Sequence, residues 1–165
     1  MHLFKLRKPN IDAVFLEYGD MLYRLAFAHL CNEADAQDVV QDVFLKYMTV
    51  QPDFNDSNHQ KAWLLRTAVN CCHDLTRRNK VRNFLPLDDA ISLADESYEG
   101  IHDLLWLMSE LPPIYKDVVV LHSLEGFTLE ETSEILQISL SAAKMRLSRA
   151  REMLENLRKD NNNVH

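Results

Sequence analysis

A chain of 165 residues, 47% of them hydrophobic, is long enough for one medium domain or two small ones with buried cores. Only three Gly and five Pro occur, which excludes a turn-rich β protein, and we expect a nearly all-α fold. The formal net charge of −7 argues at first against a nucleic-acid partner, because phosphate neutralisation drives most such binding. However, residues 86–110 carry seven carboxylates and no Lys or Arg, so the negative excess lies in one segment. Local patches elsewhere therefore decide what the protein can bind.

The sequence also indicates the compartment of the protein. No apolar run reaches the roughly 18 residues that span a bilayer, and the N-terminus lacks the apolar core of a secretion signal. We expect a cytoplasmic protein without membrane insertion. The cysteines Cys31, Cys71 and Cys72 are odd in number, and adjacent cysteines rarely bridge each other. They are predicted to be reduced, buried thiols.

Three amphipathic helices are predicted in the N-terminal half. Apolar residues recur at helical spacing from Ile11 to His29, from Ala36 to Tyr47 and from about Lys61 to Arg82. Residues 51–60, between the second and third helices, are polar and predict a loop.

The third predicted helix carries residues that suit an unpaired nucleic-acid strand. Aromatic rings stack on bases, and amide and cationic groups hold a strand backbone. The residues concerned are Trp63, Arg66 and Asn70, followed by Arg77, Arg78, Lys80 and Arg82. The alternative is that Trp63 belongs to the core and that the terminal cations complement the helix dipole.

The second predicted helix has an acidic side, with Asp35, Asp38 and Asp42 at three- and four-residue steps and Gln41 beside them. This side is a candidate docking face for a basic partner, and a solvated acidic surface is the alternative.

No metal, cofactor or catalytic site is predicted. The spacing of His29, Cys31, Cys71, Cys72 and His73 does not match the two ligand pairs of a zinc site. No glycine-rich phosphate loop or recognisable nucleophile motif occurs, which argues against an enzyme.

The acidic segment 86–100 mixes Pro, Gly, Ser and carboxylates and predicts a linker between two small helical domains, 1–85 and 101–165. After it we expect a short helix from Ile101 to Leu111, ended by two prolines, and another from Ile114 to Leu124. The fold class is therefore an N-terminal helical bundle and a C-terminal helical domain joined by an acidic linker.

The segment from Leu124 to Leu154 predicts a helix-turn-helix. Thr128 and Glu131 form a capping box at the first helix, and Ser139 is the expected N-cap of the second. In the second helix the apolar stripe places Leu140, Ala143, Leu147, Ala150 and Leu154 inward. The outward face then consists of Ser141, Ala142, Lys144, Met145, Arg146, Ser148, Arg149 and Arg151. The small and basic residues of this face suit a DNA groove, although an ordinary helical hairpin with solvated charges is the alternative.

Together these motifs resemble the sigma factors of bacterial RNA polymerase, specifically the small extracytoplasmic-function (ECF) group. DAQDVVQDVFLKY (35–47) is similar to the polymerase-docking helix of that family, and AWLLRTAVNCCHDLTRR (62–78) to its promoter-melting helix. LPPIYKDVVVLHSLEGFTLEETSEIL and SLSAAKMRLSRAREML are similar to its C-terminal promoter-reading domain.

The resemblance implies a mechanism and two partners, core RNA polymerase and promoter DNA. Asp38, Gln41 and Asp42 would dock on the coiled coil of the largest polymerase subunit. Trp63, Arg66 and Asn70 would surround a base flipped from the minus-ten element, with Arg77 and Arg78 holding the strand. Such a pocket and clamp make physical sense because extruding a base costs a few kcal/mol, which contacts to the base and the strand must offset. Ser141, Lys144, Arg146, Ser148 and Arg149 would read the minus-thirty-five element. The acidic linker would thread the RNA channel, and an inhibitory anti-sigma factor is a further candidate partner.

Three features depart from the family. Gln137 stands where Gly is common in the turn, which would cost roughly 1 kcal/mol at a positive φ. Ala142 and Ala143 replace Thr and Val, and CCH inside the melting helix is unusual, so the promoter sequence does not follow from the resemblance. A stand-alone helix-turn-helix regulator remains the competing hypothesis, and a metal-dependent hydrolase is a more distant one.

Overall fold

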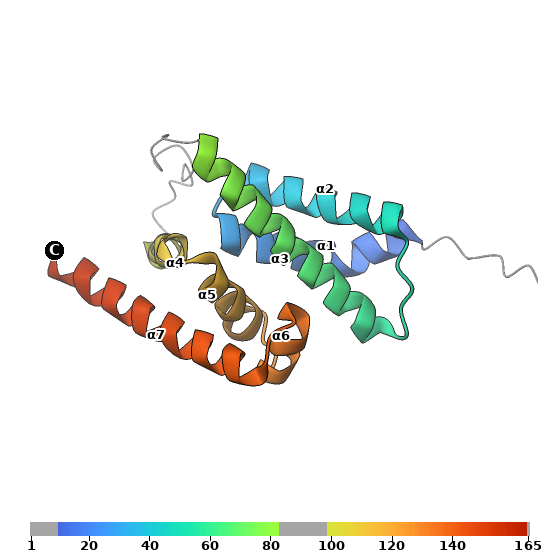
Figure 1. The fold of residues 1–165 in the computed structure, drawn as a ribbon. Helices are drawn as coiled ribbons and strands as arrows, with labels where there is room; N and C mark the ends of the chain where they lie inside the picture. Colours follow the sequence, from blue (N-terminus) through green and yellow to red (C-terminus); the bar gives the residue numbers. More distant parts are fainter. Residues whose placement is uncertain (1–9, 83–98, 165) are drawn as a thin grey trace, which may run out of the picture.

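The computed structural model describes residues 10–82 and 99–164, and every regular element in these two ranges is a helix (Figure 1). The predicted all-α class is therefore confirmed. The described residues 10–82 form three helices, namely α1 (Ile11–Leu30), α2 (Glu33–Val50) and α3 (Ser57–Arg82). The described residues 99–164 form α4 (Glu99–Glu110), α5 (Pro113–Val118), η3 (Val119–Leu124), α6 (Leu129–Leu136) and α7 (Leu140–Asn163). Within the described residues, none of these helices combines the length and apolarity that crossing a bilayer requires.

The helices α1 to α3, the N-terminal bundle, begin at side-chain caps. Asn10 accepts a hydrogen bond from the Ala13 amide, and Asn32 accepts one from the Asp35 amide at 2.9 Å. The third helix begins earlier than predicted, because Asp56 Oδ1 accepts the His59 amide at 2.7 Å. The predicted loop 51–60 is thus wrong in its last four residues, which form the first turn of α3.

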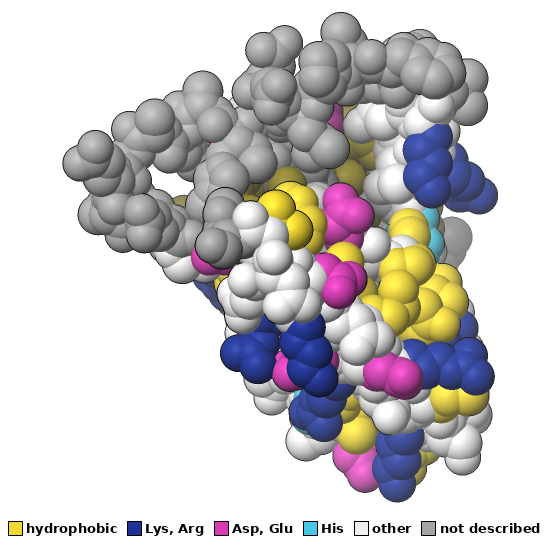
Figure 2. Space-filling model, turned by 90° about the vertical axis from the view of Figure 1, so that its left-hand side faces the viewer, with side chains coloured by type: hydrophobic (Ala, Val, Ile, Leu, Met, Phe, Trp, Pro, Cys, Tyr) yellow, Lys and Arg dark blue, Asp and Glu magenta, His cyan; other side chains and the backbone are white. Residues whose placement is uncertain are grey.

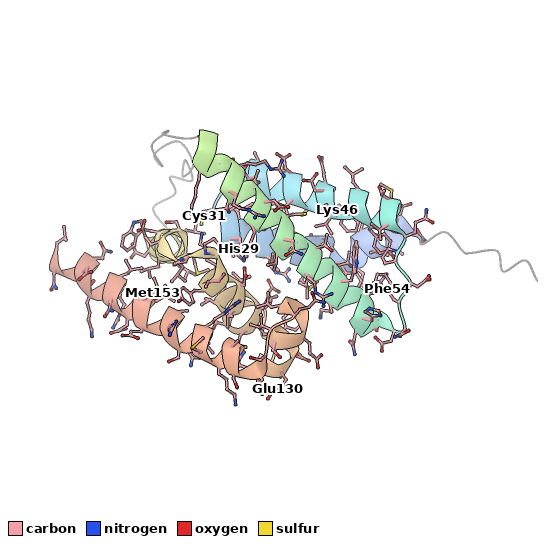
Figure 3. The ribbon with its side chains drawn as sticks, viewed as in Figure 1. His29, Cys31, Lys46, Phe54, Glu130 and Met153 are labelled. Carbon is pink, nitrogen blue, oxygen red and sulfur yellow. The ribbon has the colours of Figure 1, made fainter. Side chains whose placement is uncertain are left out.

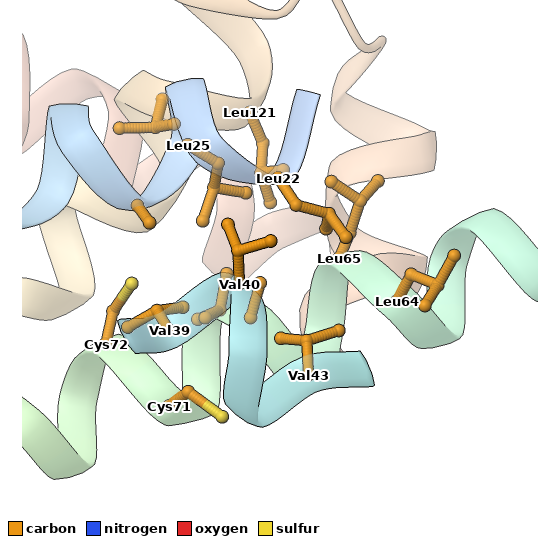
Figure 4. Packing of buried hydrophobic residues seen from close by; sticks show 14 of the residues in the cluster. Leu22, Leu25, Val39, Val40, Val43, Leu64, Leu65, Cys71, Cys72 and Leu121 are labelled. Carbon is orange, nitrogen blue, oxygen red and sulfur yellow. The ribbon is translucent and has the colours of Figure 1, made fainter. Parts of the chain in front are cut away.

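The core of the bundle lies where the three helices meet. Leu22 and Leu25 of α1, Val43 of α2 and Leu64 of α3 are fully buried. Figure 4 shows these side chains facing one another, with Leu121 of η3 reaching the same cluster from the C-terminal half. The apolar core is therefore continuous between the two halves of the chain.

The helices α4 to α7, the C-terminal unit, depart from the predicted elements in two places. The helix expected from Ile101 to Leu111 is α4, which begins at Glu99 and so takes in the last two residues of the predicted linker. The single helix expected from Ile114 to Leu124 is an α-helix only to Val118, and the chain then widens into the π-helical turn η3. The Glu125 amide bonds the Val120 carbonyl at 2.9 Å, in the five-residue step that defines this geometry.

The predicted capping signals of α6 and α7 are confirmed. Thr128 Oγ1 accepts the Glu131 amide at 3.1 Å, and a Glu131 carboxylate oxygen accepts the Thr128 amide at 2.8 Å, which completes the capping box. Ser139 Oγ accepts the Ala142 amide at 3.0 Å and starts α7. A turn of three residues therefore separates the two helices.

Gln137 ends α6 in the left-handed conformation, with φ at 55°. An L residue with a Cβ is strained there, whereas glycine is not. The positive φ that was expected at Gln137, where other family members often have Gly, is therefore confirmed.

Replacing Gln137 by Gly is expected to raise the free energy of unfolding by about 0.5–1 kcal/mol, because the strained residue is exposed and makes no core contact. Urea unfolding followed by circular dichroism measures this. Gln37→Gly, at an exposed position inside α2, is the control and should destabilise by about 1 kcal/mol. A loss of stability in Gln137→Gly would contradict the assignment of strain.

The two halves pack side by side (Figure 1). Helix α6 packs against α3, whereas α4, α5 and η3 pack against α1. On the face shown in Figure 2, basic and acidic side chains are interspersed around exposed apolar residues. The surface of the described chain on this face is therefore not uniformly acidic despite the net charge.

Candidate nucleic-acid interface

The second helix of the helix-turn-helix presents an exposed polar face. Ala143, Leu147 and Ala150 are buried against α5 and α6, as the apolar stripe predicts. The opposite side is open to solvent over four of the five candidate residues, namely Ser141, Lys144, Ser148 and Arg149. Arg146 is half-buried and so lies at the margin of this face. An exposed cationic helix that begins after a short turn has the form with which such motifs enter a major groove.

Trp63, near the start of α3, is half-buried in an aromatic cluster. Its ring lies 5.9 Å from the ring of Tyr47 and 6.1 Å from that of Phe54, both in edge-to-face geometry. Figure 3 shows Phe54 at this end of α3. The arrangement agrees with the alternative interpretation of Trp63 as a packing residue in the described conformation.

Arg66 is engaged in the fold. Its Nε donates to the Ile135 carbonyl at 2.9 Å, and its Nη2 donates to the Glu134 carbonyl at 3.2 Å. These carbonyls belong to the last turn of α6, where the Glu134 carbonyl also accepts the Gln137 amide at 3.2 Å. A side chain predicted to contact promoter DNA therefore caps a helix of the helix-turn-helix instead.

The remaining candidate residues of α3 are accessible. Asn70, Arg77 and Arg78 are exposed, and Arg77 forms an ion pair with Asp74 one turn away. Asn70 and Arg77 line an open groove of about 550 Å³, together with Lys46, His73, Asp74, Thr76, Lys80 and Pro113. The excess of cationic side chains makes this groove suited to a phosphate backbone.

Most of the acidic side of α2 faces solvent, although Asp35 is half-buried and accepts a hydrogen bond from Asn79 at 3.3 Å. Asp38, Gln41 and Asp42 are exposed on one strip, which is away from the bundle core. Leu45 and Met48 continue this side of the helix and are 55% and 45% exposed. These two residues were not predicted from the sequence, although apolar side chains at outward helical positions are a signal of a binding surface.

A polar junction joins the two halves. Asp117 of α5 is 3% exposed, and its Oδ1 lies 2.8 Å from His73 Nε2 and 2.9 Å from His29 Nε2. The neighbouring Lys116 is also buried and donates to the His29 carbonyl at 3.0 Å. From the sequence, His29 was expected at the end of the first helix and both histidines were weighed as metal ligands, whereas Lys116 and Asp117 were not singled out. A pair of opposite charges before the apolar run 118–121 was the available signal.

Burial determines the titration of this junction. Desolvation lowers the pKa of His29, and this effect exceeds the opposing attraction of Asp117. Burial alone would raise the pKa of Asp117, but the two histidines within 3 Å of its Oδ1 hold that pKa below its usual range. At neutral pH both shifts favour a neutral His29 beside a charged Asp117.

The free energy of unfolding is expected to fall as the pH drops below about 6.5. The unfolded chain takes up a proton on His29 near that pH, whereas the buried native imidazole does not, so protons favour unfolding. The loss is at most about 1.4 kcal/mol for each pH unit from this group. Urea unfolding at pH 7.5, 6.5 and 5.5 measures it. His29→Gln should flatten the dependence, whereas His59→Gln, at an exposed site, should retain it.

The three cysteines are free and buried, as predicted. Cys71 and Cys72 lie within α3, whereas Cys31 follows α1 and donates its thiol to the Leu105 carbonyl at 3.5 Å. Burial raises the pKa of all three thiols. They are therefore poor nucleophiles in the folded protein.

Family models match both halves of the chain in order. Residues 14–82 match sigma-70 region 2, and residues 101–154 match sigma-70 region 4. RNA polymerase sigma factor SigV of Bacillus subtilis is 30% identical over 150 residues, which cover 89% of this chain and 90% of SigV. ECF RNA polymerase sigma factor SigE of Mycolicibacterium smegmatis is 30% identical over 156 residues, which cover 88% of this chain but 60% of SigE.

A solved structure shares the fold. The sigma factor RpoE of Bartonella quintana, solved with the anti-sigma factor NepR, superposes with a TM-score of 0.74 at 23% sequence identity, over 91% of this chain and 97% of that one. The chain belongs to the sigma-70 family of bacterial RNA polymerase sigma factors. Within that family it is a member of the ECF group.

Proposed function

We propose that this protein binds core RNA polymerase and directs promoter-specific transcription initiation, without catalysis of its own. The observation that carries the proposal is the presence of sigma-70 regions 2 and 4 in order in one chain. Residues 1–85 would form the polymerase-docking and minus-ten domain, and residues 101–165 the minus-thirty-five domain. The intervening linker, 86–100, lies almost wholly outside the described residues. The proposal places the protein in the cytoplasm, where bacterial transcription takes place.

The minus-thirty-five element would be read by the exposed face of α7. Lys144 and Arg149 supply cationic groups for phosphates and guanine edges, Ser141 and Ser148 are small enough to allow close approach, and Arg146 lies at the margin. The positive end of the helix dipole at Ser139 adds attraction for a phosphate.

The minus-ten element would be melted along α3. Asn70, Arg77 and Arg78 are accessible, and the cationic groove beside them suits a single-stranded backbone. Arg66 and Trp63 belong to the same surface by motif position, but each must leave its described partners before it can contact a base.

Docking on polymerase would use the acidic strip of α2, formed by Asp38, Gln41 and Asp42. Its carboxylates provide charge for a basic partner, and the adjacent Leu45 and Met48 provide apolar area. We further propose that an anti-sigma factor inhibits the protein by covering one of these surfaces. A relative, the Bartonella quintana sigma factor, was solved with such an inhibitor.

Transcription in vitro tests the proposal. The purified chain is added to sigma-free core polymerase with fragmented genomic DNA, and start sites are mapped by sequencing the transcripts. A shared pair of upstream elements is expected. Lys144→Ala/Arg149→Ala should reduce initiation at these promoters at least tenfold, because each cation contributes to phosphate or base contact. Arg158→Ala, near the far end of α7, is the control and should have little effect.

A stand-alone regulator of the helix-turn-helix class would behave differently. It would fail to co-purify with core polymerase and would protect a palindromic operator by itself. That pair of results would overturn the sigma-factor function. The isolated sigma factor is instead expected to bind promoter duplex weakly, since its net charge is −7.

A further inference from the structure

Asp117 connects three helices from the two halves of the molecule. It lies on α5, and the same carboxylate oxygen faces His29 at the end of α1 and His73 in α3. Figure 3 shows His29 where α1 meets the C-terminal unit. The three side chains, here called the His–Asp–His junction, therefore tie the C-terminal unit to two helices of the N-terminal bundle at once.

Lys116 supplies a second tie at the same place. Its ammonium donates to the carbonyl of His29 in the last turn of α1, where carbonyls lack intrahelical partners. The side chains of Cys31 and Cys72 also lie close to this ammonium. Neighbouring residues of one short helix thus hold opposite charges inside the contact between the two halves.

Buried charges of this kind depend on the contact being closed. A buried carboxylate or ammonium is tolerated only while its partners remain in place, and loss of one partner leaves the others unpaired. If the two halves separate, all four side chains regain water. The junction therefore favours one closed arrangement of the two halves.

The geometry of His29 makes the junction weaker than its distances suggest. His29 Nε2 is close to Asp117 but makes no well-directed hydrogen bond to any described residue, whereas His73 is hydrogen bonded to the same oxygen. The contact between His29 and Asp117 is therefore weaker than a well-directed hydrogen bond, which lowers the free energy needed to separate the two halves.

Closure also occupies Arg66, which the proposed function assigns to promoter DNA, and other cationic groups of α3 and α1. Arg66 of α3 is used by the α6 carbonyls, and Lys61 lies 4.8 Å above the ring of Phe127. Arg24 and Glu125 form a further ion pair at 3.2 Å between the halves. The helix-turn-helix thus covers one flank of the melting helix in the described state.

We propose that the His–Asp–His junction is an intramolecular latch that holds the two halves together and masks Arg66, and that promoter melting requires its release. The masking part rests on the proposed sigma-factor function. The latch itself concerns only how the two halves of the isolated chain associate.

Fluorescence energy transfer within the full chain tests the latch. Dyes are attached at Glu17→Cys on α1 and Glu152→Cys on α7, both exposed positions, in a Cys31→Ala/Cys72→Ala background, because opening would expose the native thiols beside the junction. The wild type should give one high-transfer population. Asp117→Ala should increase the low-transfer population about tenfold or more, because both histidines lose their shared acceptor. Asp103→Ala, an exposed carboxylate on α4, is the matched control.

Variants of His73 keep the test decisive if Asp117→Ala does not fold. His73 is partly exposed, so His73→Ala should fold and open the chain. His73→Gln retains a side-chain N–H near the same place and should restore the closed population. Circular dichroism confirms that helix content is unchanged. Wild-type transfer in a folded His73→Ala or Asp117→Ala variant would overturn the latch.

Binding of a single-stranded minus-ten oligonucleotide, chosen from the mapped promoters, tests the masking. The opened variants should bind it about tenfold more tightly than the wild type, and Arg66→Ala should remove that gain. Opening without any gain in binding would overturn the masking and leave the latch intact. Opening in a chain that supports no transcription with core polymerase would instead refute the proposed function alone, because the transfer assay uses no polymerase.

Discussion

Asp38→Arg/Asp42→Arg is expected to reduce the affinity for core RNA polymerase at least 100-fold and to abolish promoter-specific transcription. The two carboxylates are one helical turn apart on the exposed side of α2. A basic partner would meet two like charges instead of two opposite ones, and close charge pairs across an interface contribute on the order of 1.5–7 kcal/mol. Titration of labelled core polymerase by fluorescence anisotropy measures the affinity directly.

The fold of this variant should be unaffected, because both side chains point into solvent and surface substitutions change stability by roughly 0.5 kcal/mol or less. Glu17→Arg/Asp20→Arg is the matched control, since it introduces the same change of charge on the exposed side of α1. Equal losses of affinity in the two variants would mean that net charge, and not the acidic strip of α2, governs docking.

Leu22→Ala is expected to lower the free energy of unfolding by about 2–5 kcal/mol. Leu22 is fully buried, and Figure 4 places it beside Leu25, Leu65 and Leu121, from both halves of the chain. Truncation removes apolar area and leaves a cavity that three packed helices cannot close. Urea unfolding at neutral pH measures the loss, which is a large part of the total stability of a small domain.

Leu16→Ala provides the control for that core variant. It is the same substitution on the same helix, but Leu16 is 83% exposed. Its effect should stay within about 0.5 kcal/mol. If Leu22→Ala cost no more than the control, the packing of α1 against η3 and α3 would be incorrect.

Local signals in the sequence predicted most of the helices correctly. The capping box at Thr128 and the N-cap at Ser139 use contacts between residues three apart, so they can be recognised in a short window. The same holds for the buried side of α7, which follows from helical periodicity alone. The start of α3 was misplaced because Asp56 was assigned to a loop, although Asp is a favoured N-cap residue.

The candidate site was predicted less completely. The exposed positions of Asp38, Lys144 and Arg149 agree with the faces expected from spacing. The engagement of Arg66 could not be predicted, because its acceptor carbonyl at Ile135 is 69 residues away. Periodicity shows which side of a helix faces outward, but it does not show which other helix covers that side.

The sequence by itself determined most of the helices, the caps at Thr128 and Ser139, the basic face of α7 and the family, because each depends on residues close together in the chain or on a motif. Tertiary structure alone decided which polar side chains are paired and which are free. Asp117 meets His73 across 44 positions, and Arg24 meets Glu125 across 101. Such pairs form only after two amphipathic units have packed, since their geometry is set by the apolar contacts around Leu22 and Leu121.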